Sequence, residues 1–312
     1  MELKAYGKIN LSLDILGRRL DGYHNISSLM QDISLYDVIE IKKCSQSGTK
    51  YNFSHCTISN VDVYLCTNLE TIPLGDDNLA VRGARAVIER LDSDGILKSS
   101  GLEEVSIFID KRLPVAAGIA GGSGNGAVTM LGINALAGYP YSLRELMELG
   151  AAVGADIPFS LMMNAKKNEE ELKELRGIEE ASTAAQTEGI GDIVRPVSPI
   201  HRFVILGNPG VAVSTREVYE AMDAIEDRVC GGELFTNQME SYTLEFYPEA
   251  AEMNKAMKSM FHAEHVLMSG SGPTMVAYYN GGYEAETDYR KITERGCKSG
   301  WRFWLAETGG VD

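Results

Sequence analysis

A dense cluster of glycines lies between Lys111 and Ala127, in the segment KRLPVAAGIAGGSGNGA. A proline comes first, and five glycines follow within nine residues, from Gly118 to Gly126. A bound phosphate needs several N–H donors that converge on it, and bare backbone at the start of a helix supplies them together with the favourable end of the helix dipole. The segment therefore predicts an anion-binding loop that leads into a helix whose body starts near Ala127.

Two common nucleotide-binding patterns match these glycines less well. A P-loop would read GxxxxGK[ST], and no lysine follows these glycines. The positions of Gly122, Gly124 and Ala127 match the looser GxGxxA dinucleotide pattern, but that pattern needs a strand running directly into its first glycine, and LPVAAGIAG intervenes. A merely flexible loop is less expected between a turn that begins with proline and an apolar helix. Ser123 and Asn125 are the polar side chains available in the loop.

Both strands and helices must carry this loop. Alternating or short apolar runs predict strands over residues 5–15, 36–43, 104–110 and 203–208. Apolar stripes at helical spacing predict helices over residues 78–91, 126–138 and 142–154. The last of these opens with Ser142, three residues before Glu145, which is the spacing of a capping box. The elements do not alternate regularly as β, α and β, so we expect an α+β protein.

Composition limits the classes of partner. A chain of 312 residues can form two ordinary domains. A net charge of −15 argues against a broad nucleic-acid-binding face or an anionic membrane surface, because both need a cationic footprint. The five cysteines form no CxxC pair, so we expect reduced thiols, and Met1 to Asn10 lacks the apolar core of a signal peptide. We therefore expect a cytoplasmic protein, and the acidic balance still allows a small phosphorylated ligand, which needs only a local pocket of donors.

One segment is unusual in its charge. Residues 166–181, KKNEEELKELRGIEEA, are mostly charged, and Leu172, Leu175 and Ile178 form only a thin apolar stripe. This pattern favours an exposed helix or a mobile excursion between the two halves of the chain over a helix that binds a partner.

Six motifs, taken in order, span most of the chain. They are AYGKINLSLDILGRRLDGYHNISS, DNLAVRGA, IDKRLPVAAGIAGGSGNGA, GADIPF, NPGVAVSTREVY and MSGSGPTMVA. With these motifs the chain resembles the superfamily of galactokinase, homoserine kinase, mevalonate kinase and phosphomevalonate kinase, and among its members those that act on a polyol linked to cytidine diphosphate. The resemblance implies an N-terminal domain over residues 1–163 that is like domain 2 of ribosomal protein S5, and a ferredoxin-like C-terminal domain over residues 164–312.

The same resemblance implies an ATP-dependent transfer of a phosphoryl group to an alcohol, with Asp156 and Lys8 as catalytic residues. Asp156 would accept the proton of the hydroxyl, whereas the sequence alone suggests a turn or helix-cap aspartate in the small-residue corner GADIPF. Lys8 would keep that carboxylate ionised and stabilise the alkoxide or a phosphoryl oxygen, whereas the sequence alone suggests an exposed strand lysine.

The resemblance also assigns the ligands. Asn10 would bind the polyol, and the rings of Tyr23 and Tyr219 would sandwich a cytosine that His24 reads by hydrogen bonds. Mg²⁺ would bridge the phosphates of ATP. Asn78 and Lys111 match positions that line the adenine pocket. The residues that match the phosphate-binding loop are Pro114, Val115, Ala116, Ala117, Gly118, Ile119, Ala120, Gly121, Gly122, Ser123 and Gly124.

The glycine loop departs from the family pattern. Ile119, Ala120, Gly124 and Gly126 stand where that pattern has leucine, glycine, serine and alanine. The methyl group of Ala120 should disfavour a positive φ, and Gly124 lacks a hydroxyl that could contact phosphate or metal. Two alternatives to the kinase expectation remain, namely another small-alcohol kinase of the superfamily and a nucleotide-binding protein that has lost catalysis.

Overall fold

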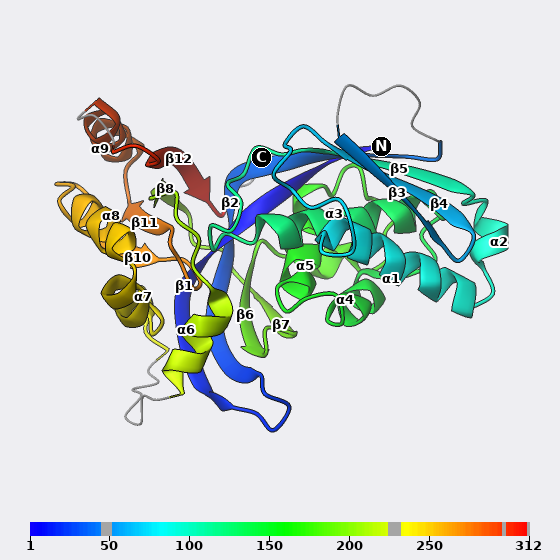
Figure 1. Cartoon of the computed structure of the whole chain (residues 1–312), viewed down its shortest axis with the longest axis horizontal. Coiled ribbons are helices and arrows are strands. Elements are labelled where there is room, and N and C mark those ends of the chain that lie inside the picture. The colour runs from blue at the N-terminus through cyan, green and yellow to red at the C-terminus, as the bar shows by residue number, and fades with distance from the viewer. Residues whose placement is uncertain (45–51, 224–231, 295–297, 311–312) are drawn as a thin grey trace. The chain divides into compact units, whose positions relative to one another are not determined.

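The chain forms two compact units in a computed structural model that describes residues 1–44, 52–223, 232–294 and 298–310 (Figure 1). The first unit consists of Met1–Gly7, Leu35–Leu113 and Gly121–Thr183. The second consists of Lys8–Ser34, Pro114–Ala120 and Ala184–Asp312. Two long strands, β1 (Glu2–Arg18) and β2 (His24–Lys42), contribute residues to both units. The predicted domain division between residues 163 and 164 stays a prediction.

The first unit has strands on one side and helices on the other. Its strands follow the order β3, β4, β5, β2, with β4 and β5 parallel and the other two pairs antiparallel. The further strands are β3 (Asn52–Ile58), β4 (Val61–Thr67) and β5 (Glu104–Asp110). The helices are α1 (Leu79–Ser93), α2 (Leu97–Ser100), α3 (Gly121–Leu136), α4 (Leu143–Gly150) and α5 (Ile157–Lys167).

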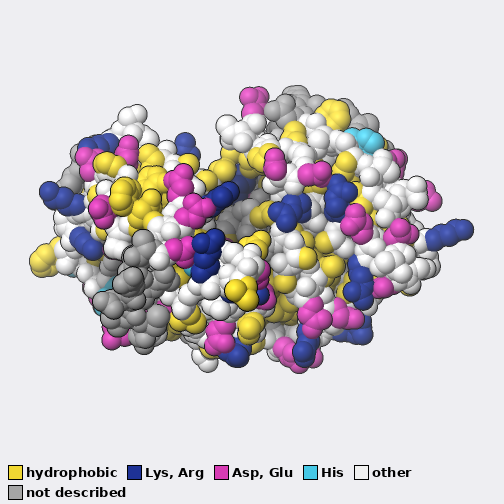
Figure 2. Space-filling model, turned by 60° about the horizontal axis from the view of Figure 1, so that its bottom comes forward, with side chains coloured by type: hydrophobic (Ala, Val, Ile, Leu, Met, Phe, Trp, Pro, Cys, Tyr) yellow, Lys and Arg dark blue, Asp and Glu magenta, His cyan; other side chains and the backbone are white. Residues whose placement is uncertain are grey.

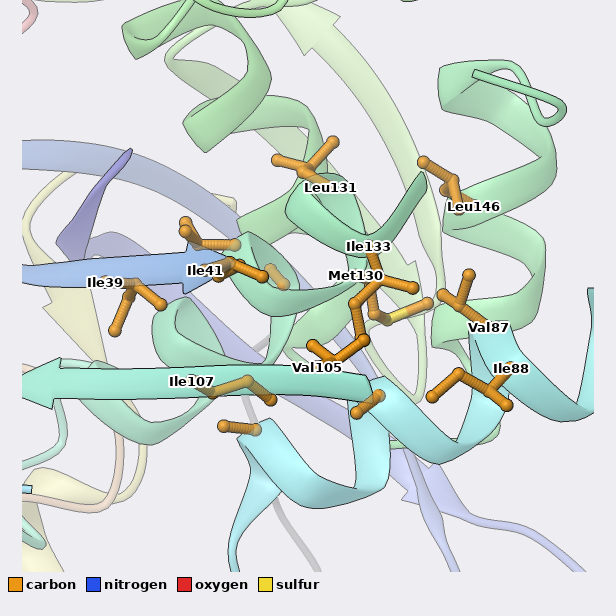
Figure 3. Packing of buried hydrophobic residues seen from close by; sticks show 14 of the residues in the cluster. Ile39, Ile41, Val87, Ile88, Val105, Ile107, Met130, Leu131, Ile133 and Leu146 are labelled. Atoms are coloured by element: carbon orange, nitrogen blue, oxygen red, sulfur yellow. The ribbon is translucent and has the colours of Figure 1, made fainter. Parts of the chain in front are cut away.

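The core of the first unit lies between these strands and helices (Figure 3). Ile39 and Ile41 of β2 and Ile107 of β5 are completely buried, and they belong to one cluster with Met130 and Ile133 of α3 (Figure 3). Alternation along the strands therefore places one row of branched side chains against the helices. Burial of these apolar side chains supplies the main driving force for folding this unit.

The second unit contains a four-stranded antiparallel sheet in the order β10, β11, β8, β12. Counted along the chain from β8, this order is second, third, first, fourth, with helices before the second and fourth strands, which is the ferredoxin-like arrangement. Its members are β8 (Arg202–Asn208), α6 (Thr215–Met222), α7 (Glu240–Phe246), α8 (Pro248–Lys258), β10 (His265–Met268), β11 (Met275–Tyr279), α9 (Gly282–Glu294) and β12 (Arg302–Thr308). The expected α+β class and ferredoxin-like C-terminal fold are confirmed.

Three short strands complete the second unit. The strands β6 (Ala184–Gly189) and β7 (Ile193–Val197) form an antiparallel pair, and β6 also pairs with the first part of β2. The third, β9 (Thr236–Asn237), pairs in parallel with β1.

Sequence signals place two helix starts correctly. Asn78 is the N-cap of α1, and its side chain accepts a hydrogen bond from the amide of Ala80 at 2.9 Å. Ser142 and Glu145 form the expected capping box at the start of α4. In both cases a side-chain oxygen satisfies an N–H group that has no partner inside the helix, which fixes where the helix begins.

The charged segment over residues 166–181 is not the exposed helix or mobile excursion that its composition suggests. The helix α5 ends at Lys167, turns follow, and a short 3-10 helix spans Ile178–Glu180. The three apolar residues of the stripe are buried in the core of the first unit. Asn168 anchors the turns, since its side chain accepts from the amide of Lys4 at 2.8 Å and donates to the carbonyl of Lys4 at 2.9 Å. Apolar burial thus outweighs the charge pattern.

The start of α3 also differs from expectation. The helix begins at Gly121, within the glycines, rather than near Ala127. A Cβ atom at Gly124 would lie 2.9 Å from the carbonyl oxygen of Tyr6, and one at Gly126 would lie 2.9 Å from the carbonyl oxygen of Leu79. These two glycines therefore allow α3 to approach the backbone of β1 and α1, and the serine of the family pattern would not fit at Gly124 without a shift.

We expect the substitution Gly126→Ala to lower the free energy of unfolding by about 1–3 kcal/mol, because the new methyl group meets backbone that cannot move independently. The matched control is Gly122→Ala, where the nearest atom to the added Cβ is Leu79 Cδ1 at 3.6 Å, an ordinary contact. The control should gain up to about 1 kcal/mol from the higher helix propensity of alanine. Urea unfolding of both variants measures the difference, and equal effects would contradict the packing role of Gly126.

Charged side chains of both signs are interspersed on the face shown in Figure 2. Among the described residues, no helix is long and apolar enough to span a bilayer. Three cysteines, at positions 44, 56 and 66, are free thiols, and Cys230 and Cys297 lie outside the described residues.

Candidate active site

The segment Pro114–Ala120 of the glycine loop is held inside the second unit by two distant motifs. The carbonyl oxygen of Ile119 accepts a hydrogen bond from the amide of Lys8 at 3.0 Å. The carbonyl oxygen of Gly118 accepts one from the hydroxyl of Ser269 at 2.9 Å. Gly118 has φ +72°, and a Cβ there would lie 2.4 Å from the carbonyl oxygen of Ser269, so only glycine fits. The motifs AYGKIN, VAAGIAG and SGSGPT therefore meet at this loop.

The conformation of Ala120 contradicts the expectation that its methyl group keeps φ negative. Ala120 has φ +53°, and Ala116 has φ +51°, so both adopt the left-handed region. This region costs a residue with a Cβ roughly 1–2 kcal/mol. The hydrogen bonds of Gly118 and Ile119, which lie between the two alanines, offset that cost by fixing the loop from outside.

The glycine-rich start of α3 belongs to the first unit. Amide groups of the first turn of a helix have no partner within the helix, and they point along its axis together with the positive end of its dipole. Gly122 is exposed and Ser123 half-buried, so this turn reaches the molecular surface. The first turn contains no acidic residue. These features suit the binding of an anion.

A buried carboxylate, Asp37 on β2, fixes both ends of the glycine segment within the first unit. Its Oδ1 accepts hydrogen bonds from the amides of Arg112 and Leu113, each at 2.7 Å. Its Oδ2 accepts from the ammonium group of Lys111. Asn125 adds a fourth donor: oriented to make hydrogen bonds, its amide nitrogen lies 2.8 Å from Asp37 Oδ2. Residues before and after the loop are thus tied to one side chain.

Lys111 is consequently engaged by Asp37 rather than presented to solvent. Its side chain is 4% exposed and that of Asp37 is 0% exposed. Burial lowers the pKa of Lys111, and the attraction and hydrogen bond of Asp37 oppose that shift. A Cβ at Gly121 would lie 2.9 Å from the Lys111 Nζ atom, so the ammonium group also lies against the start of α3.

The side chain of Asn78, the other expected adenine contact, serves as a helix cap. Besides capping α1, its amide nitrogen donates to the carbonyl oxygen of Pro73 at 2.7 Å. The expected roles of Asn78 and Lys111 toward adenine stay predictions.

Lys8 and Asn10 lie together on β1 within the second unit, and both are buried. The Nζ atom of Lys8 donates to Asn10 Oδ1 at 2.9 Å, and Asn10 Nδ2 donates to the hydroxyl of Ser28 at 2.7 Å. The alternative of an exposed strand lysine is therefore wrong for Lys8. An ammonium group held in a polar chain inside the protein is well suited to interact with an anionic ligand.

Asp156 stands at the N-cap position of α5, after the turn that contains Gly154 and Ala155. Its side chain makes no capping hydrogen bond, so a helix-cap role for this aspartate is not supported. Its own carbonyl accepts from the amide of Ser160 at 3.0 Å, which starts the helix without use of the carboxylate. The residue is half-buried.

The aromatic residues expected at the base form a stack in the second unit. The rings of His24 and Tyr219 are stacked, with centroids 5.0 Å apart and planes 22° apart. The Nε2 atom of His24 lies 2.6 Å from Asp223 Oδ1. Tyr23 is 61% exposed. The ring of His24 therefore covers one face of Tyr219.

Comparison with known proteins decides the family. Residues 78–164 match the family described as GHMP kinases N terminal domain. A 4-diphosphocytidyl-2-C-methyl-D-erythritol kinase of Alkaliphilus metalliredigens (strain QYMF) is 33% identical, over 94% of this chain and 92% of its own. The chain belongs to this kinase family. A relative of the same name from Bacillus velezensis (strain DSM 23117 / BGSC 10A6 / LMG 26770 / FZB42) is 36% identical, over 87% of this chain and 86% of its own.

Solved structures agree with this kinase assignment. The crystal structure of a 4-(cytidine 5'-diphospho)-2C-methyl-D-erythritol kinase has a TM-score of 0.72 and 25% identity, with both chains covered completely. The mevalonate kinase of Methanococcus jannaschii has a TM-score of 0.55 and 13% identity, over 98% of this chain and 97% of that one, and shows the shared fold. The resemblance inferred from the motifs is confirmed, and the protein is a kinase.

Sequence reasoning missed two carboxylates of this kinase. Asp37 carries a detectable signal, because it is in register with Ile39 and Ile41 on the buried face of β2, where a charged residue needs a partner. Asp223, which follows α6, carries no comparable signal. Within the described part of the chain, no group of three or more His, Cys, Asp or Glu residues could hold a metal ion.

Proposed function

We propose that this kinase transfers the γ-phosphoryl group of ATP to the 2-hydroxyl of 4-diphosphocytidyl-2-C-methyl-D-erythritol, a step of the non-mevalonate route to isoprenoid precursors. The observation that supports this most is the convergence of three family motifs, in which Lys8 and Ser269 both hold the loop Pro114–Ala120. Family membership over nearly the whole chain supports the choice of substrate. A cytoplasmic location belongs to the same proposal.

The nucleotide phosphates are proposed to lie at the glycine segment. Amides at the start of α3 donate to the phosphate oxygens, and the absence of acidic side chains from that turn avoids repulsion. Mg²⁺ usually takes one or two protein ligands and completes its shell with phosphate oxygens and water, so it needs no cluster of protein carboxylates. When bound, it neutralises charge on the phosphates, and Ser123 offers a hydroxyl in the same turn.

The acceptor alcohol is proposed to meet Asp156 and Lys8. An alcohol is a weak nucleophile, and a carboxylate that accepts its proton as the new P–O bond forms makes the attack easier. Asp156 is assigned this role because it matches the catalytic aspartate of the family, in the motif GADIPF. Lys8 stabilises negative charge on the alkoxide or on a phosphoryl oxygen, and Asn10, its hydrogen-bonding neighbour, binds the polyol.

The cytidine is proposed to bind at the aromatic cluster of the second unit. The exposed ring of Tyr23 and the ring of Tyr219 offer apolar faces, and His24 offers a hydrogen-bonding ring. Stacking alone tolerates any base, so hydrogen bonds from His24 must supply the preference for cytosine.

An acceptor panel tests the proposed function. Purified protein with ATP and Mg²⁺ is assayed for ADP release with the cytidyl polyol, with homoserine and with mevalonate. We expect turnover with the cytidyl polyol alone. Turnover with either other alcohol would favour a different small-alcohol kinase, and nucleotide binding without turnover of any acceptor would favour a protein that has lost catalysis.

A further inference from the structure

A carboxylate outside the predicted site, that of Asp223, lies against the ring of His24. Asp223 places Oδ1 2.6 Å from His24 Nε2 and Oδ2 3.0 Å from the guanidinium group of Arg18. The side chain of His24 is only 6% exposed, whereas that of Asp223 is 27% exposed and that of Arg18 58%. The carboxylate thus bridges a buried ring and a surface cation within the second unit.

The state of the His24 ring follows from this bridge. A carboxylate has only acceptors, so Nε2 must carry a proton to make the 2.6 Å hydrogen bond. The carboxylate of Asp223 also pairs with the guanidinium group of Arg18, and the ring of His24 is stacked on that of Tyr219. In a neutral imidazole with its proton on Nε2, Nδ1 is an acceptor.

We propose that Asp223 is a specificity-determining positioning residue that fixes the Nε2–H tautomer of His24 and thereby leaves Nδ1 to accept a hydrogen bond from an amino-substituted pyrimidine. Cytosine presents an amino group where uracil presents a carbonyl oxygen. An acceptor nitrogen on His24 can accept a hydrogen bond from the amino group of cytosine, but it repels the carbonyl oxygen of uracil. The identity of the ligand in this inference rests on the proposed function. The tautomer of His24 is inferred from its contact with Asp223 alone.

The near-isosteric variant Asp223→Asn separates this role from packing. The asparagine side chain has one oxygen and one NH₂ group, and Arg18 has only donors, so the oxygen must face Arg18. The NH₂ group then faces Nε2, which must become an acceptor, and the proton moves to Nδ1. Replacement of a carboxylate by an amide beside a histidine is known to impose the wrong tautomer in serine proteases.

The test combines ¹⁵N NMR of the histidine side chains with substrate discrimination. We expect a bare Nδ1 and a protonated Nε2 for His24 in the unmodified protein, and the reverse in the Asp223→Asn variant. The ratio of kcat/KM for the cytidyl substrate to that for its uridyl analogue should fall by about tenfold or more in the variant. Glu220→Gln is the matched control, because Glu220 lies on α6 and pairs with Arg216; its ratio should not change.

A protonated Nδ1 in the unmodified protein, with or without a proton on Nε2, would overturn the inference. So would an unchanged discrimination ratio in the Asp223→Asn variant that still folds. If no acceptor is turned over at all, the proposed function fails, whereas the NMR measurement still decides whether Asp223 sets the tautomer.

Discussion

Replacement of Asp156 by asparagine should lower kcat by about 10²–10⁴-fold, the usual contribution of a general base. The amide cannot accept the proton of the acceptor hydroxyl, whereas its size and its place at the start of α5 are unchanged. The KM for ATP should change little, because the proposed nucleotide contacts lie on the glycine segment. Single-turnover kinetics at saturating substrate measures the chemical step directly.

Two controls accompany the Asp156 variant. Glu148→Gln neutralises a carboxylate of α4 whose ion-pair partner is the exposed Arg144, and it should leave kcat unchanged. Thermal unfolding of the Asp156 variant checks that it is folded, so that a lower kcat reports the loss of the carboxylate. Lys8→Met, which keeps most of the buried apolar stem, should also lower kcat strongly, by about 10²-fold or more. Full activity of both site variants would refute the catalytic assignment.

Replacement of Asp37 by asparagine should lower the free energy of unfolding by about 3–5 kcal/mol, the typical cost of leaving a buried charge without its partner. Lys111 would keep a buried ammonium group, and the hydrogen bonds to the amides of Arg112 and Leu113 would weaken. Urea unfolding followed by circular dichroism measures the change.

A double variant keeps this prediction testable if the single variant does not fold. Adding Lys111→Met to Asp37→Asn removes the unpaired charge. The double variant should therefore recover more than half of the free energy of unfolding that the single variant loses. Asp110→Asn is the control, because its ion pair with Arg112 lies on the surface and should contribute no more than about 1 kcal/mol. A single variant that loses less than the control would show that Asp37 does not organise the loop.

Local signals in the sequence predicted local structure well. The cap at Ser142 and the strand over residues 104–110 follow from side-chain chemistry and alternation that act within a few residues. The sequence correctly predicts that the glycines lie at the start of a helix, but it only partly predicts why glycine is needed at each position. Glycine is needed at positions 124 and 126 because the carbonyl groups of Tyr6 and Leu79, which are distant in the sequence, leave no room for a side chain.

Long-range contacts account for the other differences. The charged segment over residues 166–181 has the composition of an exposed helix, yet its three apolar side chains find a place in the core. Ala120 adopts a positive φ because neighbouring loop residues are hydrogen-bonded to Lys8 and Ser269. The proposed roles of Lys8 and Asp156 rest on family resemblance, since neither a strand lysine nor a turn aspartate signals catalysis by itself.

The most direct test of the proposed reaction is the ³¹P NMR spectrum of the product formed from ATP and the cytidyl polyol. The 2-hydroxyl stands on a carbon that carries a methyl group and no hydrogen, so a phosphate added there has no three-bond proton coupling. We predict a new phosphomonoester singlet in the proton-coupled spectrum, formed together with ADP. A doublet or triplet would place the phosphate on another hydroxyl, and no new phosphomonoester signal would contradict phosphoryl transfer to this substrate.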